Sequence, residues 1–429
     1  MTLVLVVLFG LMLLGIPVAF AILSAGMAYL ATTGGSMLVV AQRLIYGLNS
    51  FTLLAVPLFI LVGNLMDFGG ISKRLTDWAK SILGWLPGGL GIVTVFSCAI
   101  FAALTGSGPA TVAAIGSIML PSMLKAGYSR ETSAGLVASA GALGPIIPPS
   151  IPMIIYGVTM NLSIPAMFMA GVVPGLVIAL ALSLVNVVFA YRNPEVLKHA
   201  KTMKFDFKES MKLFWKALGA LGLPVLILGG IYGGIFTPTE SAAVGIVYAL
   251  ILGFALKELK VKDLPKILIN SLKTSTMVNF IIAAASLFSW VVSKSQIGIV
   301  ISNAFISFVG GSQALYLFVL VVVLLIVGCL MDNVAATLIL APILIPVGIA
   351  LGCNELHIGM LFCICLVVGF VTPPFGYNLF TAVSISGLNF KQIVKGALPF
   401  LLTEIVLLFV FAYVPGIITW LPRLMGYGY

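Results

Sequence analysis

The sequence predicts an all-α polytopic membrane protein made of two inverted-topology repeats, each with a re-entrant hairpin and a broken helix. Of the 429 residues, 61% are hydrophobic and only 8% are charged, with a mean hydropathy of +1.22. The charges are segregated, since 132–191, 295–331 and 357–390 contain no Asp, Glu, Lys or Arg. A soluble protein could not cover its surface in this way, so the uncharged stretches are predicted membrane spans. Polar interruptions at corresponding places in the two halves predict the repeats.

The first interruption lies between two long uncharged runs. Gly106, Gly108 and Pro109 break the helical hydrogen-bond ladder there, while Thr105 and Ser107 bring hydroxyl groups to the break. In hydrocarbon, backbone groups released by such a break need partners in protein, water or ligand. Taken alone, this stretch is equally well explained as a packing kink.

A second interruption carries a carboxylate and an amide, from Asp332 and Asn333, inside another apolar run. When the two interruptions are aligned so that Thr337 matches Thr111, Asn333 matches Ser107. Two further interruptions follow at similar distances downstream, at 141–150 and 369–378. Paired interrupted segments in corresponding halves point to a transporter's binding site and make coincidental kinks a poor explanation.

Charge placement predicts the topology. The most hydrophilic stretch is a linker at 192–216, whose lysines outnumber its acids, so we expect it on the cytoplasmic side. Basic residues fall at opposite ends of matching elements, which lie roughly 226 residues apart, as an inverted duplication predicts. The expected spans are 3–31 (with a local break at Gly15-Ile16-Pro17), 51–67, 165–191, 213–235, 240–256, 276–293 and 396–414. Hairpin arms are expected at 90–104, 110–124, 314–331 and 336–351, broken spans at 129–160 and 356–386, amphipathic helices at 71–82 and 297–308, and a loop at Gln42-Arg43.

The two hairpin tips have complementary chemistry. Helices that begin there, at Ala110 and Ala335, point positive dipole ends and free N–H groups toward the bilayer centre, which favours a carboxylate. Helices that end there present free carbonyl groups, which favour a cation such as Na⁺. The substrate-binding candidates are Ser107, Thr111, Ser150, Asp332, Asn333 and Thr337.

Asp332 is the only ionisable side chain between Lys294 and Glu355. An intramembrane carboxylate costs about 2.5–3.5 kcal/mol on insertion scales, so a substrate or ion contact is a functional interpretation. The alternative is that Asp332 caps the adjacent helix, and Ser107, Asn333, Ser150 and Thr372 share that alternative.

Several classes of function are disfavoured. Two histidines cannot supply an HExxH site, and Asp332 has no acidic or histidine partner nearby in sequence, so we expect no enzyme. The five cysteines lack metal-type spacing and are expected in the core. Positive cytoplasmic loops explain the net charge of +10 without nucleic acid. Two asymmetric polar tips suit an occluding site better than the lumen of a channel.

The interruptions contain four motifs: Thr105-Gly106-Ser107-Gly108-Pro109-Ala110-Thr111, Gly144-Pro145-Ile146-Ile147-Pro148-Pro149-Ser150, Met331-Asp332-Asn333 and Thr372-Pro373-Pro374. With these motifs the chain resembles, over essentially its whole length, the large membrane subunit (M subunit, DctM-like) of the tripartite ATP-independent periplasmic (TRAP) transporters. The likeness is closest to the sialic-acid type. It implies the ion-transporter-superfamily fold of sodium/dicarboxylate symporters, although 106–108 and 332–334 depart from their Ser-Asn-Thr-like tips.

The resemblance implies sodium-coupled uptake of a small anionic substrate across the bacterial inner membrane by an elevator movement. Sialic acid is favoured as the substrate, with a C4-dicarboxylate next. Two partners are implied: a small four-helix membrane subunit, expected as a separate chain, and a periplasmic substrate-binding protein. A stand-alone sodium/carboxylate symporter that needs no binding protein is the alternative.

The paired interruptions also suggest where two or more Na⁺ ions bind. One is expected between the first tip and 141–147, and another between 328–332 and 369–375, with Ala103, Gly106, Gly141, Gly144, Ile147, Gly328, Gly369, Thr372 and Phe375 as the candidate residues. The predicted units are scaffold helices with an amphipathic arm (1–87), the first half of the transport domain (88–160), scaffold helices with the linker (161–313), the second half of the transport domain (314–390) and a C-terminal scaffold helix (391–429).

Overall fold

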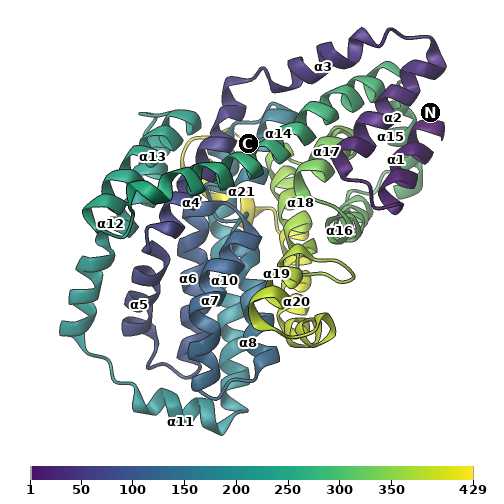
Figure 1. Cartoon of the computed structure of the whole chain (residues 1–429). Coiled ribbons are helices and arrows are strands. Elements are labelled where there is room, and N and C mark those ends of the chain that lie inside the picture. Colours follow the sequence, from purple (N-terminus) through teal and green to yellow (C-terminus); the bar gives the residue numbers. More distant parts are fainter. Residues whose placement is uncertain (1, 429) are drawn as a thin grey trace.

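The computed structural model describes residues 2–428, so Met1 and Tyr429, at the ends of the first and last predicted units, lie outside the described residues (Figure 1). Its helices are α1 (Thr2–Leu13), α2 (Val18–Thr33), α3 (Leu38–Leu48), η1 (Phe51–Leu54), α4 (Ala55–Phe68), α5 (Ile71–Leu83), α6 (Gly89–Thr105), α7 (Gly108–Lys125), α8 (Arg130–Ala140), η2 (Gly141–Leu143), α9 (Ile151–Met160), α10 (Ile164–Tyr191), α11 (Pro194–Thr202), α12 (Phe207–Tyr232), α13 (Pro238–Ala255), η3 (Val261–Asp263), α14 (Leu264–Lys294), α15 (Ile297–Val309), α16 (Gln313–Leu330), α17 (Asn333–Ala350), α18 (Glu355–Gly369), α19 (Tyr377–Ser386), α20 (Phe390–Tyr413) and α21 (Gly416–Leu424).

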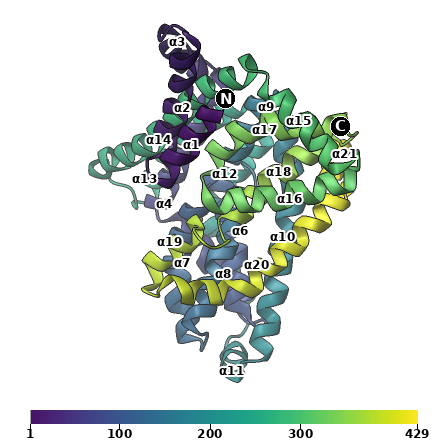
Figure 2. The same ribbon diagram turned by 90° about the vertical axis from the view of Figure 1, so that its right-hand side faces the viewer.

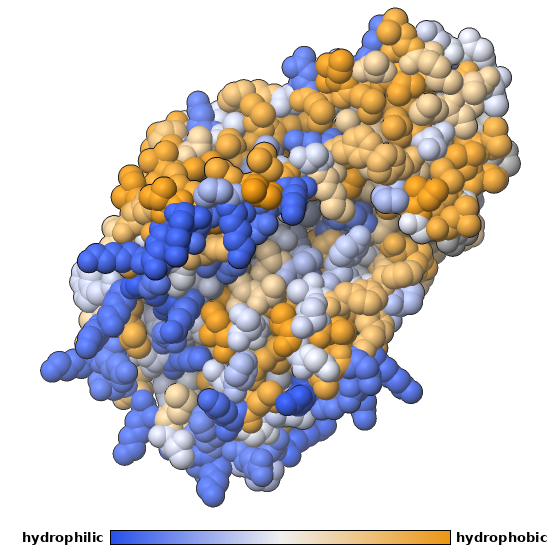
Figure 3. All heavy atoms as spheres, viewed as in Figure 1, coloured by the Kyte–Doolittle hydropathy of each residue, from blue (hydrophilic) through white to orange (hydrophobic). Residues whose placement is uncertain are grey.

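The prediction of an all-helical polytopic membrane protein is confirmed. Among the described residues, eight helices are long and apolar enough to cross a bilayer. They are η1 with α4, α10, α12, α13, η3 with α14, α16, α17 and α20. Figure 3 shows hydrophobic side chains over the upper part of one face and hydrophilic ones gathered at the lower end, around α11. That end carries the lysine-rich linker, as expected for a cytoplasmic surface.

The element order of the first half recurs in the second. Helices α7 and α17 begin at Gly108 and Asn333, which are 225 residues apart. Helices α10 and α20 begin at Ile164 and Phe390, which are 226 residues apart. The spacing therefore agrees with the repeat read from the sequence. The Pro148–Pro149 and Pro373–Pro374 peptide bonds are both cis.

The structure differs from the predictions at several element boundaries. The expected loop at Gln42-Arg43 lies inside α3, an amphipathic helix that packs along α14. There the Arg43 guanidinium lies 5.5 Å from the ring centroids of both Tyr46 and Trp290, so a charged side chain is accommodated without ending the helix. The C-terminus adds α21, which was not predicted.

Two basic segments are also more helical than expected. The linker contains α11, with Asn193 at its N-cap and Pro194 in its first turn, and α12 already begins at Phe207. Helix α14 begins at Leu264 rather than at residue 276. The predicted spans end near lysines, but a helix can continue beyond the bilayer when long basic side chains reach water.

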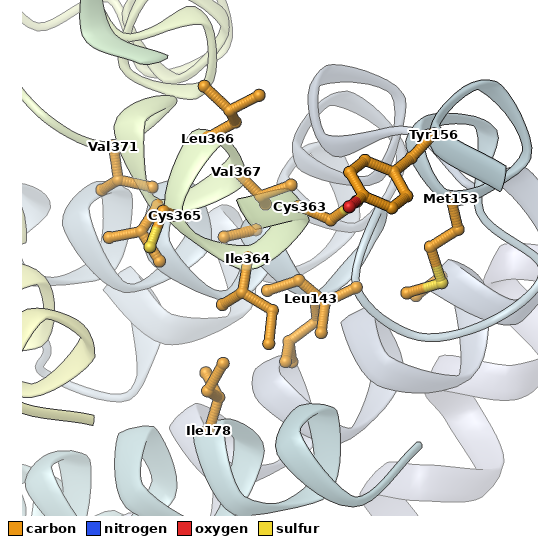
Figure 4. Close-up of a cluster of buried hydrophobic side chains, with 14 of the residues drawn as sticks. Leu143, Met153, Tyr156, Ile178, Cys363, Ile364, Cys365, Leu366, Val367 and Val371 are labelled. Carbon is orange, nitrogen blue, oxygen red and sulfur yellow. The ribbon is translucent and has the colours of Figure 1, made fainter. Parts of the chain in front are cut away.

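The protein core is centred on α18. Every residue of α18 from Leu356 to Gly369 is buried, and this helix packs against α16, α17, α20 and α10. Figure 4 shows the α18 side chains of Cys363, Ile364 and Val367 facing Leu143 and Tyr156 of the first repeat. All five cysteines are buried and free, which confirms their assignment to the core.

The helices form two packing groups. Helices α2, α3 and α4 pack against α14, α13 packs on α4, and α12 packs on α13. The second group unites the hairpins with α8, α18, α10 and α20 (Figures 1 and 2). Thus α10 and α20, predicted as scaffold, pack mainly on hairpin and broken helices, and the division into fixed and moving units stays a prediction.

Candidate functional site between the hairpin tips

The first hairpin tip is pressed against the first broken span. Helix α6 ends at Thr105, and Gly106 adopts a left-handed conformation with φ 60°. A Cβ atom added at Gly106 would lie 2.7 Å from the Pro149 carbonyl oxygen, so only glycine permits both the turn and this close approach. Ser107 is extended and its side chain does not cap α7, so the capping alternative is wrong for this residue.

The same contact brings together several predicted residues. A Cβ atom added at Gly144 would lie 2.5 Å from the Ser107 carbonyl oxygen and 2.9 Å from Thr111 Oγ1. The Thr111 hydroxyl donates to the Ser107 carbonyl at 2.8 Å and lies 3.3 Å from the Thr105 hydroxyl. Ser107, Thr111, Gly106 and Gly144 therefore form one small oxygen-rich cluster.

Three of the predicted residues around this tip have identifiable neighbours. The buried Ser150 hydroxyl donates to the Pro145 carbonyl at 2.5 Å and accepts from the Met153 N–H at 3.4 Å, so it caps α9 and the capping alternative applies. A Cβ atom added at Gly141 would lie 3.3 Å from the Gly108 carbonyl oxygen. Ile147 reaches Gly175 of α10, and Ala103 is buried near the end of α6.

At the second tip, Asp332 is the N-cap of α17. Its Oδ1 accepts from the Val334 N–H at 2.8 Å, which confirms the capping alternative without excluding a ligand contact. Asn333 is buried, and neither its Oδ1 nor its Nδ2 has a hydrogen-bond partner in the protein. The buried Thr337 hydroxyl is also unpaired. Unpaired buried polar atoms are costly, and the three at this tip lie where a ligand is expected.

The second tip also meets its own broken span. A Cβ atom added at Gly369 would lie 2.4 Å from the Gly328 carbonyl carbon, so the backbones of α16 and α18 touch directly. Thr372 donates to the Val368 carbonyl at 3.0 Å, within the same segment. The Phe375 side chain is 53% exposed.

A cavity of about 560 Å³ lies between the two tips and the opposite helices α4 and α14, a size within the usual range for ligand pockets. On the tip side its lining includes Gly106, Ser107, Gly108, Pro145, Ile151, Asp332, Asn333, Phe370 and Tyr377. On the other side it includes Ile60, Asn64, Asp67, Asn270, Thr274 and Met277. Three of the predicted substrate residues, Ser107, Asp332 and Asn333, thus line the cavity, whereas Thr111, Ser150 and Thr337 are not in its lining.

The sequence analysis did not predict the polar residues on the α4 and α14 side of the cavity. Asn64 and Asp67 lie one helical turn apart in the otherwise apolar helix α4, and Asn270 and Thr274 lie one turn apart in the more polar first half of α14. That spacing could have identified a polar face. Asn64 Nδ2 also donates to Ser271 Oγ at 2.8 Å, which joins the two helices of this wall.

Comparison with known proteins gives a consistent result. Residues 5–417 match the family described as the DctM component of the tripartite ATP-independent periplasmic transporters. The C4-dicarboxylate TRAP transporter large permease DctM of Pseudomonas aeruginosa is 40% identical over 94% of each chain. The sialic acid large permease SiaM of Vibrio cholerae is 34% identical over 98% of each chain.

A solved structure supports the fold independently of close sequence similarity. The YdaH transporter of Alcanivorax borkumensis matches with a TM-score of 0.61 and 13% identity, over 94% of this chain and 89% of its own. At that identity the likeness shows the fold alone. Taken with the tips, the cavity and the family match, it leads to one conclusion: the chain belongs to the DctM family and is the multi-pass large permease of a bacterial TRAP transporter, not an enzyme.

Proposed function

We propose that this permease carries out sodium-coupled uptake of an organic carboxylate across the bacterial inner membrane by an elevator movement of two inverted repeats. One observation carries the proposal: the cavity is bounded by two interrupted hairpins on one side and by intact helices on the other. At the hairpin side, α7 and α17 begin at Gly108 and Asn333, so two positive helix ends are directed at the same space. These ends favour an anionic substrate.

The elevator movement is supported by how the two packing groups meet. The tips belong to the group of α8 and α18, whereas α4 and α14 belong to the other group. The two groups meet where α4 packs on α6 and α14 packs on α17, and a Cβ atom added at Gly63 of α4 would lie 3.3 Å from Thr105 Cγ2. Small side chains at such a boundary permit sliding.

The residues at the tips fit a sodium ion as co-transported cargo. Around Gly144, the Ser107 carbonyl and the Thr111 hydroxyl supply hard oxygen atoms in a space that any Cβ would fill. Around the second tip, Asn333 Oδ1 and Thr337 Oγ1 are buried oxygen atoms without protein partners. Free carbonyls and hydroxyls at interrupted helices are the donors that transporters use for Na⁺.

The partners follow from the family. A tripartite transporter needs a periplasmic binding protein to deliver substrate and a small membrane subunit, which we propose is a separate four-helix chain. The lipid bilayer is the other partner. The family match disfavours the alternative of a stand-alone symporter, because a tripartite transporter includes a periplasmic binding protein.

Reconstitution tests these proposals. The permease and its small subunit are reconstituted into proteoliposomes. The binding protein and radiolabelled C4-dicarboxylate or sialic acid are added outside, with and without an inward Na⁺ gradient. Uptake should need both the gradient and the binding protein. Uptake without the binding protein would favour the stand-alone symporter, and uptake that is unchanged in choline buffer would refute sodium coupling.

Binding measurements on the periplasmic binding protein identify the substrate. The higher identity of the C4-dicarboxylate relative, 40% against 34%, makes a C4-dicarboxylate the first compound to test and sialic acid the second. The binding protein should be stabilised thermally by one class of acid and not by the other. The same acid should then drive uptake.

A further inference from the structure

Asn378 connects the two repeats through a single buried amide. It lies in the first turn of α19, in the second repeat, and is fully buried. Its Nδ2 donates at 3.0 Å to the carbonyl of Ala138, a residue 240 positions earlier in the first repeat. Ala138 is in the last turn of α8, where carbonyl groups lack helical partners, so Asn378 caps this helix from across the molecule.

This cap fixes the direction of the other amide atom. Because Nδ2 donates to Ala138, Oδ1 is turned toward α7, and a Cβ atom added at Gly108 would lie 2.7 Å from it. A Cβ atom added at Gly141 would lie 3.3 Å from Nδ2 and equally close to the Gly108 carbonyl oxygen. Asn378 Oδ1 thus adjoins the segment between the first tip and Gly141, yet it has no hydrogen-bond partner in the protein.

A second buried asparagine gives a useful comparison. Asn186 on α10 donates through Nδ2 to the Gly88 carbonyl at 2.9 Å, and its Oδ1 is likewise unpaired. Asn186, however, lies against Gly88 and Gly91, at the opposite end of α6 from the hairpin tip. Asn378 Oδ1 instead lies beside Gly108, where α7 begins at the first tip, and a buried oxygen without a donor at that place is suited to a cation.

We propose that Asn378 Oδ1 is a ligand of the first sodium ion, so that the ion site in the first repeat is completed by a residue of the second. This inference rests on the proposed sodium coupling. It also supplies a physical link to the substrate, since the Asn378 N–H donates to the Phe370 carbonyl at 3.1 Å and Phe370 lines the cavity. Sodium at the first site would therefore order one wall of the substrate cavity.

The test measures Na⁺ binding directly, not only uptake. The purified permease complex is titrated with NaCl against choline chloride at constant ionic strength, and thermal unfolding and tryptophan fluorescence are recorded. Asn378→Ala should raise the Na⁺ concentration for half-maximal stabilisation about tenfold or more, as the loss of metal-site groups commonly does. A smaller stabilisation by Na⁺, from the ion site proposed at the second hairpin tip, should remain. Asn186→Ala, which removes an amide with the same bonding, should leave the Na⁺ midpoint unchanged.

Asn378→Asp keeps the oxygen atom that faces α7, loses the Nδ2 donor to the Ala138 carbonyl as alanine does, and covers the case in which the alanine variant does not fold. It should bind Na⁺ within severalfold of the wild-type affinity. The inference is overturned if Asn378→Ala folds with an unchanged Na⁺ midpoint, or if Asn378→Asp loses Na⁺ binding as fully as alanine. If the wild-type complex shows no Na⁺ response, the proposed sodium coupling fails first and this inference falls with it.

Discussion

Joining α4 to the first hairpin tip by a disulfide should stop transport. In the double variant Gly63→Cys and Thr105→Cys, a Cβ atom at residue 63 lies 3.4 Å from Thr105 Cβ, a few tenths of an ångström below the average of about 3.8 Å in disulfides. Because a disulfide rarely allows Cβ atoms to separate beyond about 4.5 Å, the cross-linked pair permits only about 1 Å of relative movement. An elevator step, which slides one packing group along the other, should be blocked.

A matched control lies within one packing group. In the variant Gly26→Cys and Leu287→Cys, the Cβ atoms of α2 and α14 would be 3.8 Å apart. Both cross-links should form on mild oxidation, as measured by mass spectrometry. Uptake into proteoliposomes should stop only in the first variant and return after reduction with dithiothreitol. Complete cross-linking between residues 63 and 105 with unchanged uptake would refute the proposed movement.

Three further substitutions probe the tips. Gly369→Ala places a Cβ atom 2.4 Å from the Gly328 backbone, so it should lower the free energy of unfolding by about 1–3 kcal/mol and lower the melting temperature. The control Gly229→Ala, whose Cβ atom has no neighbour within 4 Å, should leave stability unchanged or raise it. Asp332→Asn keeps an oxygen that can cap α17, so the protein should fold normally while uptake falls; full uptake would limit Asp332 to capping. Thr337→Val removes a hydroxyl with no protein partner, so thermal stability should be unchanged or higher, and a clear drop in uptake would assign that hydroxyl to a ligand.

The hairpin tips could be predicted from sequence because their chemistry is local. Glycine and proline inside an apolar run must break a helix wherever the chain folds, and Asp332 caps the helix that begins directly after it. Glycines at 106 and 144 also mark close backbone contacts, although the sequence does not reveal which backbone each one meets.

What could not be predicted depends on contacts between distant residues. Gln42 and Arg43 looked like a loop because their polarity was considered without Trp290, which lies far away in sequence and covers the arginine. Asn378 lies at the end of the predicted interruption at 369–378, but its role depends on Ala138, 240 residues earlier. The polar wall of α4 and α14 became a candidate only when the tips were found facing it.

The distribution of unpaired polar atoms indicates which side of the cavity holds the cargo. On the opposite wall, Asn64 is bonded to Ser271, and none of the buried side-chain atoms found unpaired in the described residues belongs to α4 or α14. On the hairpin side, Asn333 lines the cavity with both of its side-chain polar atoms unpaired, and Thr337 and Asn378, outside the lining, also have buried atoms without partners. A ligand lowers the free energy most where it pairs buried atoms that otherwise have no partner, which favours the hairpin side. Cargo bound in this way is held by the hairpins, so in the proposed elevator movement it would travel with them past α4 and α14.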